Sequence, residues 1–449
     1  MAHLSVPKSG PLVETAAEKA IFSKVNWHIL PLLLVAYVFA YIDRVNIGYA
    51  QLQMKTDLNF SNEIFALGAG LFFVGYFLFE VPSNLLLEKI GARKTILRIM
   101  ICWGICATLM AWAHTPWQFY TLRFLLGAFE AGFFPGVILY FTYWYPTARR
   151  GRAIAIFMTA TQLASILVGP LNGALMKYGE GFLSMHGWQW MFLFNGAPCL
   201  IIAVLVYFML TDKPANAKWL TDEEKKILID RVESEKTSTG HGHGHGAMGQ
   251  LLKDPKVFVL AAAYFLVLAA AYALVFWAPS LIMSWGAADV FQVGLLKAIA
   301  SVAGIIGMVL ISRSSDRMNE RRWHFAFAIG CVVVGLGLIA IFAPSLVGSM
   351  ALFSLTSVGM SAATPLFFAF ISEYLPKETA AGGIALISSL GNLGPAISPS
   401  ISTWILTTTG DNKYSLLFIC TLYTLAALIM LAAGRTTVPA SSKPVAQPA

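Results

Sequence analysis

The sequence is poor in charged residues. Asp, Glu, Lys and Arg make up only 12% of its 449 residues, about half the share found in soluble domains, whereas 57% of the residues are hydrophobic. This shortage of charge excludes an ordinary soluble protein. Most of the chain must instead have lipid as its solvent.

Cysteines are also few, and the polar segments are short. All five cysteines lie within apolar stretches, where we expect small buried hydrophobic residues rather than disulfides or a metal site. They are Cys102, Cys106, Cys199, Cys331 and Cys420. No polar segment is long enough for a separate enzymatic domain, and no His, Cys or Ser constellation accompanies the acids of the apolar stretches. We therefore expect neither an enzyme nor a bound cofactor.

Twelve apolar stretches are present, and each is long enough to cross a membrane, which takes about 20 residues of helix. They cover residues 27–48, 64–87, 95–113, 117–140, 153–176, 188–210, 257–283, 291–311, 325–343, 345–371, 382–406 and 414–433. The first is too long for a secretory signal and lacks a cleavage pattern, so we expect it to be retained. The predicted fold class is an all-α membrane protein with twelve transmembrane helices.

The basic residues are distributed unevenly. The formal net charge of +8 is by itself compatible with binding to nucleic acid. However, 25 of the 31 Lys and Arg residues lie on one side of the predicted helices, the side of both termini. Such an excess marks the cytoplasmic side of a membrane protein. We therefore predict a multi-pass inner-membrane protein in contact with lipid, with cytoplasmic termini and no nucleic-acid partner.

Two halves of the chain repeat the same elements. Glu88 and the bases after it recur as Asp316 and its bases 228 residues later, and Pro146 recurs as Pro376 after 230 residues. This near-constant spacing indicates a duplication, which predicts two six-helix bundles related by pseudo-symmetry. The predicted segments are a cytoplasmic N-terminal segment (1–26), a first bundle (27–210), a cytoplasmic linker (211–255), a second bundle (256–434) and a cytoplasmic tail (435–449).

The linker between the bundles has two parts. Thr221 and Glu224 have the spacing of a capping box, which predicts an amphipathic helix that ends near Glu235 and lies on the cytoplasmic face. The following residues 237–246 alternate His and Gly toward their end. Histidines bind transition metals, but the glycines leave nothing to preorganise them, so we predict a flexible linker.

Several motifs occur together. They are Glu88 to Lys94 with its echo at Asp316 to Arg322, Tyr41 to Asn46, Val81 to Asn84, Arg123 to Glu130, and Trp219 to Thr221. In combination they resemble the major facilitator superfamily, and within it the anion:cation symporter branch, over residues 27–434. That branch includes bacterial sugar-acid, tartrate and phthalate permeases and, more distantly, sialic acid and vesicular glutamate carriers. The resemblance implies two rocking bundles that import a small organic carboxylate with protons by alternating access.

Two other functions are compatible with this fold. An organic-anion exchanger or exporter would use the same helices, and a membrane sensor would bind a ligand without transporting it. The sequence does not distinguish a sugar acid, a tartrate-like dicarboxylate and an aromatic carboxylate. We expect a monomer.

Five charged residues stand out within the predicted helices: Asp43, Arg44, Arg123, Glu130 and Lys297. A charge at the bilayer centre costs at least about 2.5–3.5 kcal/mol on insertion scales, so each requires a partner or a cavity. We expect Asp43 to pair with Arg123 and Arg44 to bind the substrate carboxylate, with Arg123 also near the substrate. Glu130 and Asp43 are the predicted proton-coupling acids. In the alternative interpretation, the four residues other than Lys297 only neutralise one another and fasten two helices together.

Further substrate-binding candidates are weaker. Uncharged ones are Tyr41, Tyr76, Gln162, Ser388 and Asn392, and the resemblance implies groups near Tyr76, Gln162 and Asn392. Serine and asparagine bridge packed helices just as readily. Lys297 departs from the family pattern, as do Ala92 and the pair Phe367-Phe368. Lys297 either reaches the outer headgroups or faces the cavity, where it would favour a dicarboxylate.

Charged residues also follow the second and eighth stretches, at their cytoplasmic ends. They are Glu88, Arg93, Lys94, Asp316, Arg317 and Arg321. We predict that they form contacts between the bundles and close an inner gate.

Overall fold

A computed structural model describes residues 16–238, 254–342, 345–375 and 380–434. The predicted His- and Gly-rich end of the linker and the predicted C-terminal tail lie outside these residues, as does Pro376. All secondary structure among the described residues is helical. The fold class predicted from the sequence is therefore confirmed.

The helices divide into an earlier and a later set along the chain. The earlier set is α1 (Ala16–Val45), α2 (Ile47–Leu58), α3 (Asn62–Ile90), α4 (Ala92–Leu109), η1 (Met110–Trp112), α5 (Pro116–Glu130), α6 (Phe133–Trp144), α7 (Thr147–Tyr178), η2 (Phe182–Ser184) and α8 (Gly187–Met209). After η3 (Pro214–Asn216) and α9 (Asp222–Ser238), the later set is α11 (Pro255–Ser284), α12 (Val290–Met318), α13 (Arg322–Phe342), α14 (Leu346–Tyr374), α15 (Ala380–Gly391), α16 (Gly394–Thr409) and α17 (Asn412–Gly434).

Twelve segments of the described chain are long and apolar enough to cross a membrane, as predicted. Three of these spans consist of two α-helices each, because short breaks separate α1 from α2, α5 from α6, and α15 from α16. Broken helices are common where transporters bind their substrates. The five cysteines are free in this structure, and Cys106, Cys199 and Cys420 are buried.

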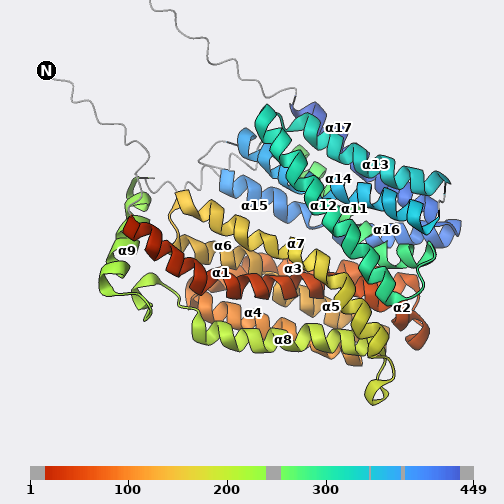
Figure 1. Cartoon of the computed structure of the whole chain (residues 1–449), viewed down its shortest axis with the longest axis horizontal. Helices are drawn as coiled ribbons and strands as arrows, with labels where there is room; N and C mark the ends of the chain where they lie inside the picture. The colour runs from red at the N-terminus through yellow and green to blue at the C-terminus, as the bar shows by residue number, and fades with distance from the viewer. Residues whose placement is uncertain (1–15, 239–253, 343–344, 376–379, 435–449) are drawn as a thin grey trace, which may run out of the picture.

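The helices pack as two bundles (Figure 1). Helices α1 to α8 contact one another and form the first bundle, and α11 to α17 form the second. We call the end of the molecule that carries α9 and the start of α1 the linker face. The end that carries α2 and the last turns of α16 is the opposite face.

The bundles meet toward the opposite face, through the helix pairs α7 and α12, α3 and α16, and α2 and α11. The side-chain amide of Gln51 on α2 donates to the carbonyl oxygen of Phe276 on α11 at 2.8 Å. At the surface, Lys177 of α7 and Asp289 before α12 form an ion pair at 2.7 Å. The hydrogen bond from Lys177 lowers the pKa of Asp289 below its usual value, so the acid stays ionised at neutral pH. These contacts hold the opposite face closed.

The linker helix α9 is attached to the first bundle. Thr221 and Glu224 form the predicted capping box, with each side chain accepting from the other residue's backbone N–H at 3.2 and 2.9 Å. Glu224 also pairs with Lys24 of α1 at 2.7 Å, and the ring of Trp219 stacks on His28 with centroids 4.1 Å apart. The linker helix therefore belongs to the first bundle on the linker face.

Candidate functional site

A buried ion pair joins α1 to α5 inside the first bundle. Arg44 Nη2 lies 2.5 Å from Oε1 of Glu130, and the two side chains are 14% and 2% exposed. Both residues stand at the end of their helices, directly before the breaks in these spans. We expected Arg44 to bind the substrate carboxylate, and in this conformation its guanidinium pairs with Glu130. A substrate carboxylate can replace Glu130 only if that acid is neutralised, because an unpaired buried charge is costly.

Arg44 also contacts the second bundle. Its Nη1 donates to the hydroxyl oxygen of Tyr272 on α11 at 3.3 Å. Tyr272 follows Arg44 by 228 residues, the spacing that also relates Glu88 to Asp316. The two residues thus occupy equivalent positions of the duplicated halves. The sequence analysis missed Tyr272, although this repeat spacing would have pointed to it.

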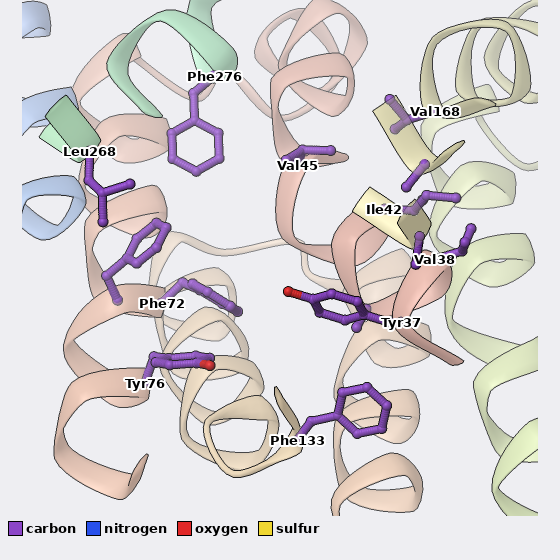
Figure 2. Packing of buried hydrophobic residues seen from close by; sticks show 14 of the residues in the cluster. Tyr37, Val38, Ile42, Val45, Phe72, Tyr76, Phe133, Val168, Leu268 and Phe276 are labelled. Atoms are coloured by element: carbon purple, nitrogen blue, oxygen red, sulfur yellow. The ribbon is translucent and has the colours of Figure 1, made fainter. Parts of the chain in front are cut away.

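Two aromatic rings of α3 cover the Arg44 guanidinium. The ring centroids of Phe72 and Tyr76 lie 5.5 and 5.2 Å from its central carbon. Figure 2 shows both side chains projecting from α3 toward Tyr37 of α1. Cation–π contacts of this kind stabilise a desolvated guanidinium by about 2 kcal/mol. Tyr76, a predicted substrate-binding residue, therefore helps to hold Arg44 in place in this structure.

Asp43 and Arg123 do not form the ion pair that we expected. Asp43 is fully buried and accepts from the Asn46 amide at 3.4 Å and from the Cys199 thiol at 3.5 Å. Arg123 is also fully buried, but its Nε donates to the carbonyl oxygen of Gly68 on α3 at 3.2 Å. The guanidinium of Arg123 is thus directed at the backbone of α3. Both charges remain inside the first bundle, which favours a role in the bundle's internal charge balance.

A small cavity lies between the bundles, on the opposite-face side of Arg44. Its volume is about 50 Å³, room for only a few water molecules, so an organic anion requires the lining helices to move apart. The lining combines hydroxyl, amide and ammonium groups with a few apolar ones. It consists of Tyr41, Val45, Tyr49, Gln162, Ser165, Val168, Val275, Pro279, Lys297, Ser301, Ser357, Met360 and Ser361. Two predicted candidates, Tyr41 and Gln162, are therefore part of this lining.

Lys297 faces this cavity, which decides between its two predicted positions. Its Nζ lies 3.4 Å from the hydroxyl oxygen of Ser301 and 5.6 Å from the ring centroid of Phe353. Among the described residues, no carboxylate lies within ion-pair distance of this ammonium group. A cation without an acid, in a cavity between two bundles, is suited to bind an anion.

Ser388 and Asn392 lie away from this cavity. Both belong to the region where α15 gives way to α16, and the backbone N–H of Asn392 donates to the carbonyl oxygen of Ser388 at 3.1 Å. Neither contributes to the cavity lining as described. The structure thus brings Tyr41, Gln162 and Lys297 together and leaves these two at a helix break.

One intramembrane acid was missed by the sequence analysis. Glu80 lies on α3, one helical turn beyond Tyr76 toward the linker face. Its Oε2 atom is buried and has no hydrogen-bond partner. Counting every acid inside the second apolar stretch, 64–87, would have found Glu80.

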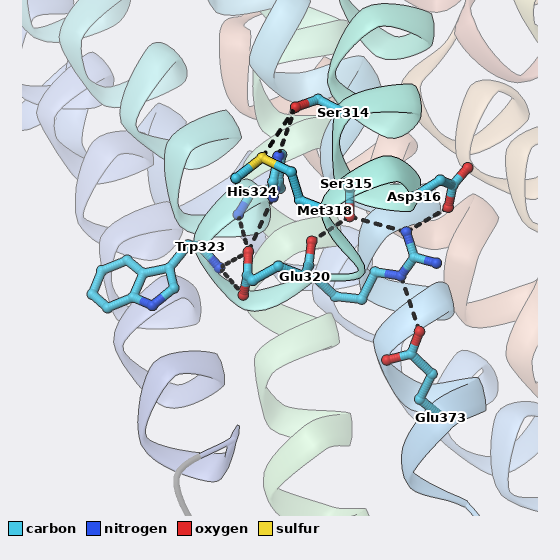
Figure 3. Close-up of polar contacts among 9 residues, drawn as sticks. Ser314, Ser315, Asp316, Met318, Glu320, Trp323, His324 and Glu373 are labelled. Atoms are coloured by element: carbon cyan, nitrogen blue, oxygen red, sulfur yellow. Dashed lines mark hydrogen bonds and ion pairs between the residues drawn. The ribbon is translucent and has the colours of Figure 1, made fainter.

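The predicted gate residues contact their own bundle in this structure. In the first bundle, the backbone N–H of Arg93 donates to the Asp212 carboxylate at 2.8 Å. In the second bundle, Arg321 pairs with Asp316 at 2.5 Å and with Glu373 at 3.0 Å. Figure 3 shows Asp316 and Glu373 on either side of this shared base.

This arrangement has a physical reason. The contacts that join the bundles lie toward the opposite face, so charged groups on the linker face find partners within their own bundle. Contacts between the bundles at this face stay a prediction for the conformation in which the linker face closes. That prediction also covers Lys94, Arg317 and Glu88, although the Glu88 side chain lies outside the described part of the structure.

Comparison with known families and relatives gives a consistent result. The family model described as Major Facilitator Superfamily matches residues 33–353 and 321–449. A protein of Agrobacterium vitis named "Putative tartrate transporter" is 43% identical over 93% of this chain and 96% of its own length. The "Putative metabolite transport protein NicT" of Pseudomonas putida is 40% identical over 89% and 91%.

Solved structures show a similar fold. A bacterial homologue of the human lysosomal transporter Spinster, described as inward-facing and unoccupied, has a TM-score of 0.75 over 94% of this chain and 98% of its own. A D-xylose-proton symporter has a TM-score of 0.70 over 90% and 97%. The sequence identities are only 15% and 16%, so these structures bear on the fold alone.

Proposed function

Because this chain belongs to the Major Facilitator Superfamily, and is therefore a multi-pass membrane transporter rather than an enzyme, we propose that it imports a hydroxylated organic dicarboxylate together with protons. The observation that carries the proposal is Lys297, an ammonium group in the cavity between the bundles to which the described residues offer no carboxylate partner. The two relatives named "Putative tartrate transporter" support an anion of this kind.

The linker face is the cytoplasmic face in this proposal. Most Lys and Arg residues lie at that face, as the positive-inside rule requires of a cytoplasmic side. The contacts near the opposite face then close the outer side of the transporter. The conformation described here is the one that releases substrate inward.

Two cations along the path favour an anion with two carboxylates. Lys297 binds one carboxylate in the outer half of the cavity, and Arg44 binds the other nearer the middle once Glu130 releases it. The lining hydroxyls of Tyr49 and Ser357 have no hydrogen-bond partner among the described residues, so they can bind substrate hydroxyls. A site built from such groups discriminates against an aromatic acid, which would leave them unpaired.

Proton coupling follows from competition for Arg44. With Glu130 ionised, the two side chains neutralise each other and the guanidinium is occupied. A proton taken up from the outside neutralises Glu130, so that Arg44 becomes available to the substrate carboxylate. The bundles then rock, and both ligands leave on the linker face. Each ligand therefore favours binding of the other, which is the requirement for symport.

Uptake of tartrate into proteoliposomes tests this function. With an acidic outside, radiolabelled tartrate should accumulate above its external concentration, and a protonophore should abolish the accumulation. Export against the same gradient, or exchange that ignores the gradient, would support the exchanger or exporter interpretation instead. Saturable binding without flux would indicate a sensor. Either result overturns the proposed import.

The substitution Lys297→Gln should weaken dicarboxylate binding. Loss of a hydrogen bond to a charged group costs about 1.5–3 kcal/mol, so we expect KM for tartrate to rise about tenfold or more. Proton dependence should persist, because Arg44 and Glu130 are unchanged. Initial uptake rates over a range of tartrate concentrations measure this effect. Lys413→Gln, which removes an exposed lysine at the opposite face, is the matched control. An unchanged KM in the Lys297 variant would remove this residue from the site.

A further inference from the structure

Glu80 has no role in the proposed transport cycle, although a carboxyl group at this depth is costly. It lies within a span of apolar residues on α3, where an ionised acid needs a partner, a proton or water. Its backbone carbonyl accepts from the side-chain amide of Asn84 at 2.9 Å. The Oε2 atom of its carboxyl group is buried without a partner. A purely structural acid would be expected to have its oxygens satisfied.

Glu80 lies close, along α3, to the ring that covers the cation bound by Glu130. Tyr76, whose ring covers the Arg44 guanidinium, precedes Glu80 by one turn of α3. Arg44 uses Nη2 for Glu130 and Nη1 for Tyr272, whereas its Nε is buried without a partner. Arg44 therefore has a spare donor, and Glu80, one turn of α3 beyond the ring that covers Arg44, has a spare acceptor.

Other charged groups around Glu80 come from the helices packed on α3. Helix α4 contributes Arg98, whose Nη2 donates to the hydroxyl oxygen of Ser83 at 3.0 Å, on the linker-face side of Glu80. Helix α5 contributes Arg123 and Glu130, and α2 carries Lys55 and Asp57 at the far end of the molecule. Helix α16, which packs on α3 from the second bundle, has no titratable residue. Glu80 thus lies between Arg44 and Arg98 along the direction to the linker face.

The Glu130 and Glu80 side chains differ in exposure, and therefore in how readily each can exchange a proton with water. The Glu130 side chain is 2% exposed, so a proton bound there has little direct contact with water. Glu80 is partly exposed and lies nearer the linker face, where the bundles make fewer contacts. A proton that leaves Glu130 toward the linker face needs an acceptor on that side. Glu80 on α3 lies on that side and can accept it.

We propose that Glu80 is a second proton-binding site, which takes the transported proton from Glu130 and passes it to the linker face. The inference rests on the proposed proton symport. When the substrate leaves Arg44, the Glu130 carboxyl group loses its proton and pairs with Arg44 again. The Glu80 carboxylate binds that proton, and then gives it to water on the linker face. No other bond is made or broken.

The substitution Glu80→Gln tests this site in proteoliposomes. Proton-driven tartrate accumulation should fall about tenfold, the effect of losing about 1.4 kcal/mol of coupling free energy. Tartrate counterflow at equal pH on both sides should stay within about twofold of the unmodified protein, because no net proton movement is required. Glu63→Gln, on the same helix but exposed at the opposite face, is the matched control and should behave like the unmodified protein.

The possible outcomes separate this inference from the proposed function. If the unmodified protein does not accumulate tartrate with a proton gradient, both fail. If it does, and Glu80→Gln accumulates tartrate equally well or loses counterflow as well, only the Glu80 inference fails. Should Glu80→Gln not fold, Glu80→Asp keeps the charge and shortens the side chain. That variant should shift the internal pH at which uptake is half-inhibited, and an unshifted profile would overturn the inference.

Discussion

Glu130→Gln is expected to abolish proton-driven accumulation while leaving exchange intact. Glutamine keeps the size of Glu130 but carries no charge and binds no proton, so Arg44 loses its ion-pair partner permanently. The substrate then finds Arg44 available at every stage of the cycle, and binding no longer depends on protonation. For one proton per anion, a gradient of two pH units drives about hundredfold accumulation, which we expect the variant to lose.

The measurement pairs two assays on the same vesicles. Uptake with an acidic outside reports coupling, and counterflow at equal pH reports substrate binding and movement of the bundles. Counterflow serves as the internal control for folding and insertion. Accumulation by Glu130→Gln at the level of the unmodified protein would show that the Arg44 ion pair is not the coupling element. The site would then have to be sought at Asp43, the other buried acid of the first bundle.

The fold was largely predictable because lipid imposes a simple rule on the sequence. Each span must be a helix of about 20 apolar residues, and the sequence shows twelve such stretches. The breaks within spans were not predicted. At the break between α5 and α6, Ala131 and Gly132 remain close to helical geometry, and only tertiary packing decides that the hydrogen-bonding pattern is interrupted there.

The pairing of charges inside the helices was harder to predict. Asp43 and Arg44 are neighbours, and which of them faces α5 depends on the rotation of α1 about its axis, because consecutive helix residues point about 100° apart. The sequence favoured an ion pair between Asp43 and Arg123, but the structure pairs Arg44 with Glu130. The difference arises from helix rotation and tilt, which side-chain packing such as that of Phe72 determines.

The orientation of Lys297 shows a related limit. Helix α12 is apolar nearly all round, so the pattern of hydrophobic residues does not reveal which side faces lipid. Only the packing of α12 on α7 and α14 directs Lys297 into the cavity. Gln162 on α7, another residue predicted to bind substrate, lines the same cavity.

Closure of the opposite face depends on two glycines in different bundles. Gly169 of α7 and Gly294 of α12 lie backbone to backbone, and a β-carbon added at either position would overlap the carbonyl oxygen of the other. One turn further along α7, a β-carbon at Gly173 would lie 2.6 Å from the carbonyl oxygen of Val290. Small residues four apart allow membrane helices to approach in this way. Helices α7 and α12 can therefore approach this closely only because these positions are glycines.

Gly294→Leu should consequently stop transport without unfolding either bundle. The leucine forces α7 and α12 apart, and overpacking of this kind costs about 1–3 kcal/mol or more at a contact that exists only when the opposite face is closed. The conformational equilibrium then shifts toward the state that is open on that face. We expect both uptake and counterflow to fall about a hundredfold, because each requires the closed state in every cycle.

Labelling with a membrane-impermeant maleimide distinguishes this mechanism from misfolding. A cysteine introduced at Ser301, in the cavity lining, should become more reactive from the opposite face when Gly294→Leu is also present. Gly337→Leu is the matched control, since a β-carbon at Gly337 meets no atom within 4 Å. It should transport and label like the unmodified protein. If Gly294→Leu transports at a normal rate, close approach of α7 and α12 is not part of the cycle, and the closed opposite face cannot be the state from which substrate is released.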